Sequence, residues 1–423
     1  MNEELLQYIW MAGLFNANNL KSTDGQDIIV YKRGRLNANS GPDFSNANIR
    51  IGDTEWVGNV EIHLNSDEWY QHKHHLDKGY NTTILHVVLK CNAQCVREDG
   101  SELICIELND RIEPAIIQNY ESLKTSTNWV ACENSINKID HFTIEQTLDR
   151  QLINRLERKC LKINEWMTKG VNDWNDVLYH SLARSFGFNT NSEAFEQVAL
   201  NLPLNLLIRN KNDSNTIDSL VFGVAGYLED EIDEVYFNTL KKEWKFLQKK
   251  HKLFQLEKSS FKFMRMRPGN FPCMRLAQFA SLAVKCPELF IAIQTQFTLE
   301  NIYKLFEISP NPYWQTHYHF NKESNPHNTS LSKQAIHHII INTIVPVFFA
   351  FGKHIGDAQF CEQVINLLHK LPAEQNNTIK KWKSINIHAK DAFHSQALLE
   401  LKNENCDLRK CLNCKIGTKV LNL

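Results

Sequence analysis

The spacing of apolar residues changes near residue 140, and this change constrains the fold more than any other feature. Before it, alternating segments predict strands at 27–33, 47–51, 56–64, 83–90 and 102–108, after an amphipathic helix at 3–15. After it, apolar residues recur at intervals of three and four, and glycine and proline separate the segments. We therefore predict an α+β protein. A small mixed-sheet domain over 1–135 precedes a large all-α domain over 140–423, with the boundary in 109–140.

Size and composition agree with this plan. A chain of 423 residues is too long for one ordinary core. Its 43% hydrophobic and 22% charged residues are typical of a soluble globular protein. The formal net charge of −1 lacks the basic excess of most nucleic-acid-binding proteins.

Targeting signals and cysteine usage predict a compartment. The first residues are acidic, unlike a secretory signal, and the apolar run 339–351 is too short and too polar to cross a membrane. Eleven scattered cysteines then indicate free thiols rather than disulfides. We expect a cytoplasmic protein with no membrane association.

Two short motifs in the strand region carry the most explicit chemistry: Gly-Pro-Asp at 41–43 and Glu-x-His at 61–63. Side chains two apart on a strand share a face, so Glu61 and His63 project together, and Asp43 enters the neighbouring strand. Carboxylates at such a sheet edge can hold a divalent cation, which phosphodiester hydrolysis uses to neutralise the phosphate and activate water. The alternative interpretation is a polar, solvent-facing strand beside a turn aspartate.

This order of residues, after a first helix, resembles the PD-(D/E)XK nucleases with their restriction-endonuclease-like core. The resemblance covers about residues 1–110. It implies a mixed sheet flanked by helices, with Asp43 and Glu61 binding Mg²⁺ or Mn²⁺. Glu3 or Glu4 would match the helix acid that some members carry.

The position of His63 departs from that family, where lysine is usual. An imidazole can position or deprotonate the attacking water, but it lacks the fixed charge of lysine. Lys73 or Lys78 could take over that role, or the chain could be an inactive relative. The resemblance therefore implies either a metal-dependent nuclease or a nuclease-derived scaffold that binds nucleic acid or protein without cleaving it.

A histidine-rich segment follows the Glu-x-His motif. Residues 66–77 contain three histidines and three acids, and His86 lies on the next predicted strand. These side chains suit zinc, manganese or iron, and on a helix His72 and His75 would share a face. The segment is either a metal site flanking the first or a solvated helix anchored by Trp69. We expect His72 and His86 to matter most.

The C-terminal region carries a further group of potential metal ligands: Cys406, Cys411 and Cys414. Thiolates at this spacing can bind zinc or an iron–sulfur cluster, and a zinc site would bring the sulfurs to about 4 Å of one another. Both metals usually take four ligands, so Cys132, Cys160 or His394 would have to complete the set. A cysteine-bearing tail without metal is the alternative.

Three arginines surround a proline-containing turn before a predicted helix at 272–285: Arg265, Arg267 and Arg275. They could hold the phosphate backbone of nucleic acid at the helix N-terminus, near aromatic residues on which bases stack. The alternative is a buried turn whose arginines pair with the acidic stretch 229–234.

The whole chain also resembles a bacterial family of proteins of unknown function. Three segments carry this resemblance: 58–63, 265–272 and 411–417. It implies no activity, so the choice between DNA and RNA, and the oligomeric state, stay open.

Overall fold

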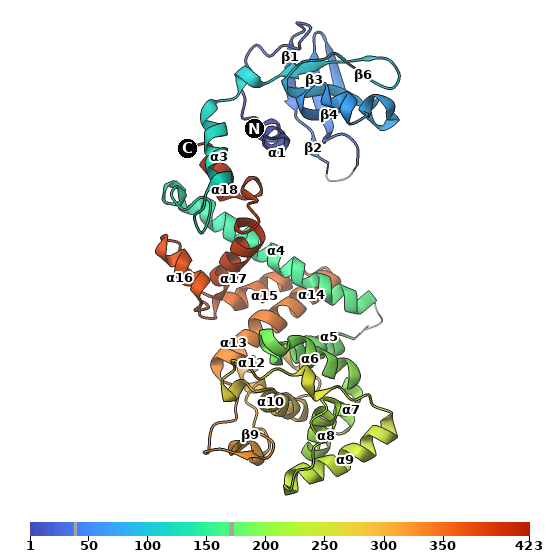
Figure 1. The fold of residues 1–423 in the computed structure, drawn as a ribbon, viewed down its shortest axis with the longest axis vertical. Coiled ribbons are helices and arrows are strands. Elements are labelled where there is room, and N and C mark those ends of the chain that lie inside the picture. The colour runs from blue at the N-terminus through green and yellow to red at the C-terminus, as the bar shows by residue number, and fades with distance from the viewer. Residues whose placement is uncertain (38–39, 169–172) are drawn as a thin grey trace. The chain divides into compact units, whose positions relative to one another are not determined.

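The computed structural model describes residues 1–37, 40–168 and 173–423 and confirms a mixed α+β fold (Figure 1). Its contacts divide the chain into two units. The first consists of Met1–Asp149 and Leu401–Leu423, and the second of Arg150–Glu400. Within the described ranges the large sheet lies in the first unit, and the second is helical apart from the hairpin β9 (His317–His319) and β10 (Lys322–Glu323).

This division differs from the expected boundary near residues 135–140. Helix α4 (His141–Thr168) begins in the first unit and continues into the second. The C-terminal helix α18 (Lys415–Leu421) packs against α3 (Pro114–Thr125), where Asn119 Nδ2 donates a hydrogen bond to the Leu421 carbonyl at 3.2 Å. The cysteine-bearing tail therefore belongs with the sheet, and because this is a tertiary contact no composition change along the chain marks it.

The first unit is built on a mixed sheet with strand order β1-β3-β4-β5-β8, and β2 pairs with β3. The strands are β1 (Ile28–Lys32), β2 (Arg35–Leu36), β3 (Phe44–Ile51), β4 (Thr54–Asn65), β5 (Thr83–Lys90) and β8 (Cys105–Glu107), with β6 (Cys95–Val96) and β7 (Glu102–Leu103) as a separate pair. Strands β3 and β4 form an antiparallel hairpin, whereas β4, β5 and β8 run parallel. The predicted strands are thus present, and their pairing places the Asp43 end of β3 beside the centre of β4.

Residues 60–63 of β4 are buried on both faces of the sheet. Val60 and Ile62 are fully buried on one face, while Glu61 is 5% and His63 1% exposed on the other. Helix α1 (Glu3–Ala12) packs against β4 and buries its apolar stripe of Leu5, Leu6, Ile9 and Trp10. The solvent-facing strand considered from the sequence is therefore wrong, because Glu61 and His63 lie under other elements.

The second unit agrees with the three-and-four periodicity. Its helices are the end of α4, α5 (Trp174–Phe186), α6 (Phe188–Asn201), α7 (Leu204–Arg209), α8 (Ser214–Val224), α9 (Val235–His251), α10 (Pro272–Lys285), α11 (Leu289–Thr295), α12 (Leu299–Leu305), α13 (Lys333–Ile339), α14 (Val345–Ile355), α15 (Ala358–His369), α16 (Asn377–Ser384) and α17 (Ala392–Glu400). Helices α7, α11 and α16 span only six to eight residues, too few for the periodicity of the sequence to mark them clearly.

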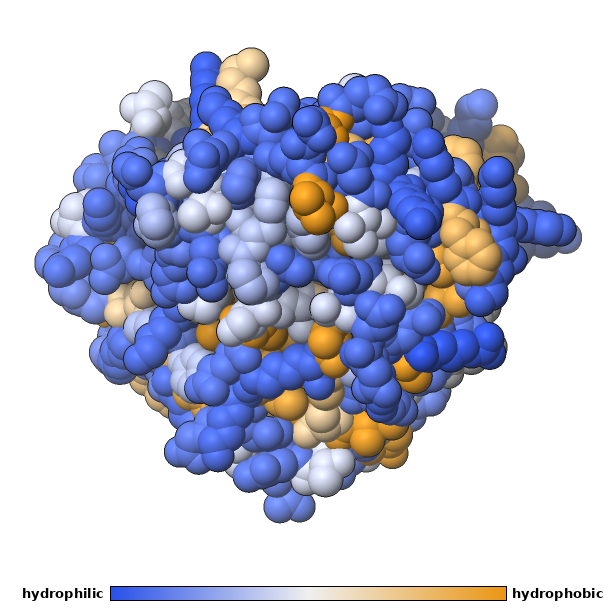
Figure 2. Space-filling model, turned by 90° about the horizontal axis from the view of Figure 1, so that it is seen from below, coloured by the Kyte–Doolittle hydropathy of each residue, from blue (hydrophilic) through white to orange (hydrophobic). Residues whose placement is uncertain are grey.

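The apolar run 339–351 belongs to a longer helical stretch than its sequence suggested. A π-helical turn (Ile340–Ile344) joins α13 to α14, and the stretch Lys333–Ile355 is long and apolar enough to cross a membrane. However, 78% of its most apolar window is buried inside the protein, and a core helix passes the same test. Helices α10 and α11 pass it only together, across a bend of 62°. The face in Figure 2 is mainly hydrophilic, with apolar side chains scattered in small groups.

Candidate metal centre

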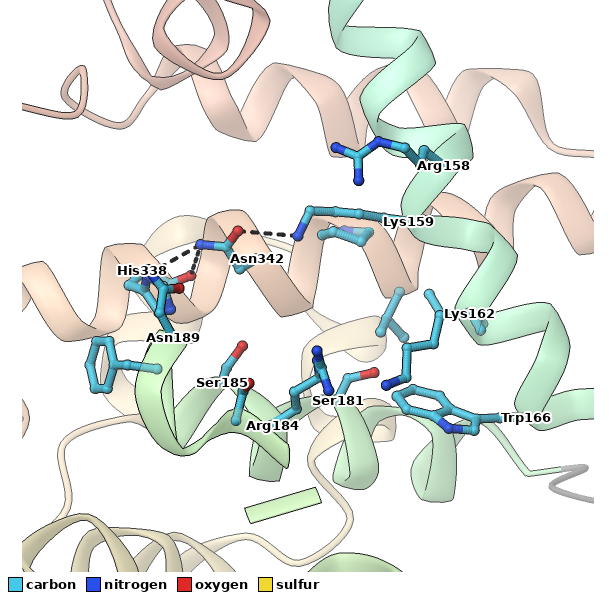
Figure 3. Close-up of a pocket in the computed structure, with 15 residues that line it drawn as sticks. Arg158, Lys159, Lys162, Trp166, Ser181, Arg184, Ser185, Asn189, His338 and Asn342 are labelled. Carbon is cyan, nitrogen blue, oxygen red and sulfur yellow. Dashed lines mark hydrogen bonds between the residues drawn. The ribbon is translucent and has the colours of Figure 1, made fainter. Parts of the chain in front are cut away.

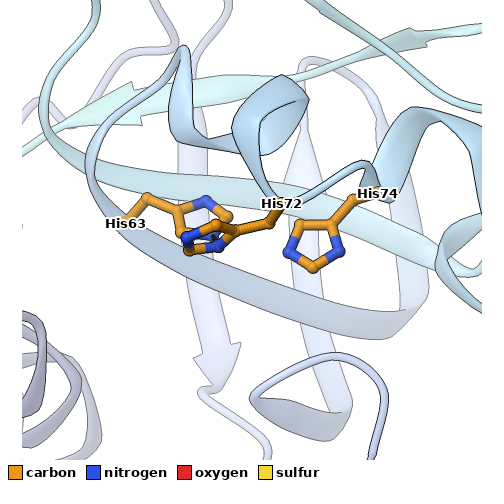
Figure 4. Close-up of side chains that lie close together, drawn as sticks. All are labelled: His63, His72 and His74. Carbon is orange, nitrogen blue, oxygen red and sulfur yellow. Dashed lines mark hydrogen bonds between the residues drawn. The ribbon is translucent and has the colours of Figure 1, made fainter.

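The side chain of His63 meets three other histidines, and two of them, His72 and His74, are drawn with it in Figure 4. Its Nδ1 lies 2.8 Å from Nε2 of His86 on β5, and its Nε2 lies 3.1 Å from Nδ1 of His72. The ligand atoms of His63, His72 and His74 all lie within 4.8 Å of one another. The structure therefore brings His72 and His86 to His63 and adds His74.

His74 enters the cluster because a helix ends early. Helix α2 (Glu68–Gln71) stops before Lys73, whose backbone is left-handed with φ of 64°, an uncommon conformation for a residue with a side chain. The chain turns there, and the His75 ring packs against Tyr70 instead, with centroids 4.9 Å apart. The shared helical face expected for His72 and His75 is wrong, since no helix joins them.

Glu61 supplies an oxygen beside these nitrogens. Its Oε1 lies 3.3 Å from Nε2 of His74 and 3.6 Å from Nε2 of His63. The buried Nε2 of His74 nevertheless has no hydrogen-bond partner among the described residues. Metal–nitrogen bonds of about 2.0–2.1 Å in a tetrahedral site place ligand atoms about 3.4 Å apart. The three histidine nitrogens therefore lie close enough to share one cation, and Glu61 Oε1 lies near two of them, those of His63 and His74, but not within 4.8 Å of all three.

Asp43 holds Glu61 in place through reciprocal hydrogen bonds. The Asp43 backbone N–H donates to Glu61 Oε2 at 3.0 Å, and the Ile62 N–H donates to Asp43 Oδ2 at 3.1 Å. From α1, Gln7 Nε2 donates to Asp43 Oδ1 at 3.0 Å and to Glu3 Oε1 at 3.3 Å. The structure thus brings Asp43 and Glu61 together, but both Asp43 oxygens accept protein hydrogen bonds, and Glu61 Oε1 is the oxygen that faces the imidazoles.

Burial sets the charges of this site. It raises the pKa of Glu61 to about 8, together with the charges of Asp43 and Glu3. Burial and the neighbouring histidines lower the pKa of His63 to about 2 and of His74 to about 4. His63 is therefore neutral near pH 7 and does not supply the positive charge of the lysine it replaces. Neutral imidazole is, however, the form that binds metals.

Lys73 and Lys78 are exposed, so neither replaces the family lysine inside the site.

The donor set indicates which metals fit. Three imidazole nitrogens and one carboxylate oxygen suit zinc, manganese or iron better than magnesium, which prefers oxygen ligands. The donor atoms of this centre therefore fit Mn²⁺, whereas they fit less well the Mg²⁺ that the resemblance places between Asp43 and Glu61.

The three arginines expected to hold phosphate are placed differently from one another. Arg265 and Arg267 are exposed, whereas Arg275 is 6% exposed, and its guanidinium lies 4.5 Å from the centre of the Phe188 ring. Arg275 donates hydrogen bonds to Gln278 and Asn270 at 2.8 and 2.5 Å. The acidic stretch 229–234 is paired by Lys241 and Lys258 instead.

Of the three residues that could complete the cysteine cluster, Cys132 is the one that lies in the same unit as Cys406, Cys411 and Cys414. Cys160 and His394 belong to the second unit, but Cys132 lies with the C-terminal cysteines in the first. Burial and the thiols of Cys414 and Cys411 raise the pKa of Cys132 to about 12. Two contacts tie its segment to the cysteine loop: Arg409 donates to the Ser126 carbonyl at 2.7 Å, and the Lys402 ammonium lies 5.2 Å from the Trp129 ring centre.

The sulfurs of this cluster are more widely spaced than expected. Among the described residues, the groups of three or more ligand atoms within 4.8 Å of one another are His63, His72 and His74, and His369, Asp391 and His394. The cysteine sulfurs therefore do not reach the separation of about 4 Å that one zinc ion requires.

Residues 3–377 match a family model described as a protein of unknown function, DUF2851. The chain belongs to the DUF2851 family. No curated protein and no solved structure matches it. The part that matches DUF2851 contains the metal centre and the three arginines, and it ends before Cys406, Cys411 and Cys414. The family description states no activity, so function has to be argued from the site.

Proposed function

We propose that this DUF2851 protein is a divalent-metal-dependent hydrolase that cleaves phosphodiester bonds in nucleic acid. The observation that carries the proposal is the group of His63, His72 and His74, whose ligand atoms all lie within 4.8 Å of one another, with Glu61 Oε1 3.3 and 3.6 Å from the Nε2 atoms of His74 and His63. The antiparallel hairpin β3–β4, with parallel β5 beside it and α1 packed on it, supports the resemblance to a PD-(D/E)XK core.

The side chains of the site have two roles: some would bind the cation, and the others position the side chains that bind it. His63, His72, His74 and Glu61 would bind it, and when bound such a cation neutralises charge on the phosphate and lowers the pKa of a water molecule. His86 orients the His63 ring through Nδ1, as outer partners of metal-binding histidines do. Asp43 fixes Glu61, and Gln7 fixes Asp43.

Access to the centre comes from the side of His72. Glu61, His63 and His86 are buried, whereas His72 is exposed and Asp43 is partly exposed. A phosphate group reaching the cation would therefore pass His72 and Asp43. The runner-up function is a scaffold that binds nucleic acid or protein through the same unit without cleaving it, and only a cleavage assay separates the two.

The test combines metal analysis with cleavage of single- and double-stranded DNA and RNA by the full chain. We expect the purified protein to carry about one zinc, manganese or iron per chain and to lose cleavage activity with a chelator. His74→Ala should lose both metal and activity. His75→Ala is the matched control, because His75 neighbours His74 but packs against Tyr70.

The experiment tests metal binding and cleavage separately. If His74→Ala and His75→Ala retain equal metal, the centre is wrong. If the metal depends on His74 and Glu61 but no nucleic acid is cleaved with zinc, manganese, iron or magnesium, the hydrolase is wrong and the scaffold function is supported.

We also propose a second, structural metal site in the cysteine cluster. Four thiols, Cys132, Cys406, Cys411 and Cys414, raise one another's pKa, as neighbouring groups of like charge do. Because their sulfurs are spaced too widely for one zinc ion, an iron–sulfur cluster fits them better. Cys132→Ser should lose iron and visible absorbance in anaerobically purified protein, and Cys286→Ser, whose thiol has no other thiol acting on it, should keep both. Iron-free parent protein would refute this site.

A further inference from the structure

The second unit contains a cavity lined by an unusual number of basic side chains (Figure 3). Its volume is about 340 Å³. Helix α4 contributes Arg158, Lys159 and Lys162 to its wall, α5 contributes Arg184, and the stretch Lys333–Ile355 contributes His338 and Asn342. The cavity lies within one unit, so its walls are placed by the packing of that unit alone.

Two carboxylates, those of Glu400 and Glu196, form the ion pairs that the structure shows beside the cavity. Glu400 pairs with Arg158 at 2.6 Å and with Arg155 at 3.7 Å. Glu196 pairs with Lys162 at 2.7 Å and Arg184 at 2.5 Å.

Lys159 is a fifth basic side chain, so the described ion pairs set two carboxylates against four other basic side chains and leave Lys159 without a carboxylate partner. Two more distant groups also act on this cavity. Glu374 acts on Arg155 only at longer range, and Arg275 adds positive charge near His338.

Among these five basic side chains, Lys159 is the one without an ion pair in the described part of the chain. Its ammonium donates one hydrogen bond, to Asn342 Oδ1 at 3.2 Å, and forms no ion pair within the described part of the chain. Burial and the charges of Arg155 and Arg158 lower its pKa to about 7. An unpaired, partly buried ammonium beside guanidinium groups costs folding free energy, so an anion from outside would relieve it.

The remaining lining groups can bind oxygen atoms or pack against a flat group. Ser181 and Ser185 on α5 and Asn189 on α6 also line the cavity, and the Ser185 hydroxyl is hydrogen-bonded to that of Thr343 at 2.5 Å. The Trp166 ring lies at one end, with the Lys162 ammonium 5.3 Å from its centre. His338 is neutral near pH 7, because burial and the neighbouring cations lower its pKa to about 4.

We propose that this cavity binds a small ligand that carries a phosphate or polyphosphate group. Four basic side chains line the cavity and match a multivalent anion better than a single carboxylate, and guanidinium and ammonium groups together suit phosphate oxygens. The volume is within the range of small-molecule sites, whereas an extended nucleic-acid strand requires an open groove. The site lies outside the metal centre and is independent of the proposed hydrolase activity.

The test measures binding of inorganic phosphate, pyrophosphate and a short single-stranded oligonucleotide to the full chain, with a chelator present so that the metal centre is empty. Calorimetry gives the affinity, and the thermal shift gives an independent readout. We expect pyrophosphate to bind more tightly than phosphate and to raise Tm. Lys159→Met should weaken pyrophosphate binding by at least about tenfold, the usual effect of losing one charged hydrogen bond.

The matched control is Lys249→Met, which removes the same charge from an exposed position on α9. It should bind pyrophosphate like the parent protein. A second cavity variant, Lys162→Met, leaves Glu196 paired with Arg184 and should also weaken binding.

Three results would overturn the proposal. The first is no pyrophosphate binding by the parent protein. The second is equal weakening by Lys159→Met and Lys249→Met, which would show a general charge effect. The third is binding of the oligonucleotide with loss in Lys159→Met but no binding of pyrophosphate, which would assign the cavity to an extended strand.

Discussion

Replacing Lys159 with methionine should make the ligand-free protein more stable near neutral pH. The side chain carries a charge that the protein leaves without an ion pair, and methionine fills a similar volume without that charge. The change forfeits the hydrogen bond to Asn342, which contributes about 1 kcal/mol. The net gain in the free energy of unfolding therefore equals the cost of holding the charged ammonium in the folded protein, minus the contribution of this hydrogen bond.

The lowered pKa of Lys159 sets the size and pH range of this effect. Its fall from 10.5 to about 7 corresponds to at most about 5 kcal/mol. Because the side chain is only partly buried, screening by solvent reduces this value, and we expect about 2 kcal/mol. Between the two pKa values the unfolded chain binds more protons than the folded one, so the penalty is complete below about pH 7 and fades toward about pH 10.

Urea titrations at about pH 7 and about pH 10 test this reasoning. The free energy of unfolding of the parent protein should rise relative to Lys159→Met as the pH increases, so that the variant is more stable near pH 7 and less stable near pH 10. Lys249→Met serves as the control, and its difference from the parent should not change with pH. A constant difference between the parent and Lys159→Met would show that Lys159 is not electrostatically strained, and the argument for an anion would lose its main support.

Four further variants test other parts of the structure. His72→Ala should lower metal affinity at least about tenfold while leaving the Tm of chelator-treated protein unchanged, because His72 is exposed. Burial raises the pKa of Asp218 from 3.8 to about 7, so parent stability should fall relative to Asp218→Asn as pH rises from about 4 to about 7, and parallel curves would contradict this. Gly223→Ala places a methyl group 2.1 Å from the Trp244 ring and should cost about 1–3 kcal/mol or more in urea denaturation. Gly269→Ala meets no atom within 4 Å and should cost less than about 0.5 kcal/mol.

The site histidines show how far local sequence information reaches. The alternation around Glu61 and His63 places both side chains on one face of β4, because strand geometry has a period of two. The choice of His74 over His75 depends on the left-handed residue Lys73, which sequence periodicity does not reveal. A helix continued through that residue would have put the wrong histidine in the cluster.

The sequence does contain a pattern that indicates the basic side chains of the cavity, although it is not a known motif. Arg155, Arg158, Lys159 and Lys162 recur at intervals of three and four along α4, so they share one helical face. Such a stripe usually faces solvent. Only the packing of α5 and the stretch Lys333–Ile355 against that face turns it into the wall of a cavity.

The sequence by itself determined the α+β class, most of the strands and long helices, and the proximity of Asp43 to Glu61, because these depend on periodicities within about twenty residues. The tertiary structure alone decided that the C-terminal cysteines return to the sheet-bearing unit, that Arg275 is buried, and that Lys159 faces Asn342. Each of these pairings joins residues separated by a hundred or more positions or depends on which surface a neighbouring helix covers. Local propensity carries no information about such contacts, since they are selected by the burial of apolar surface across the whole chain.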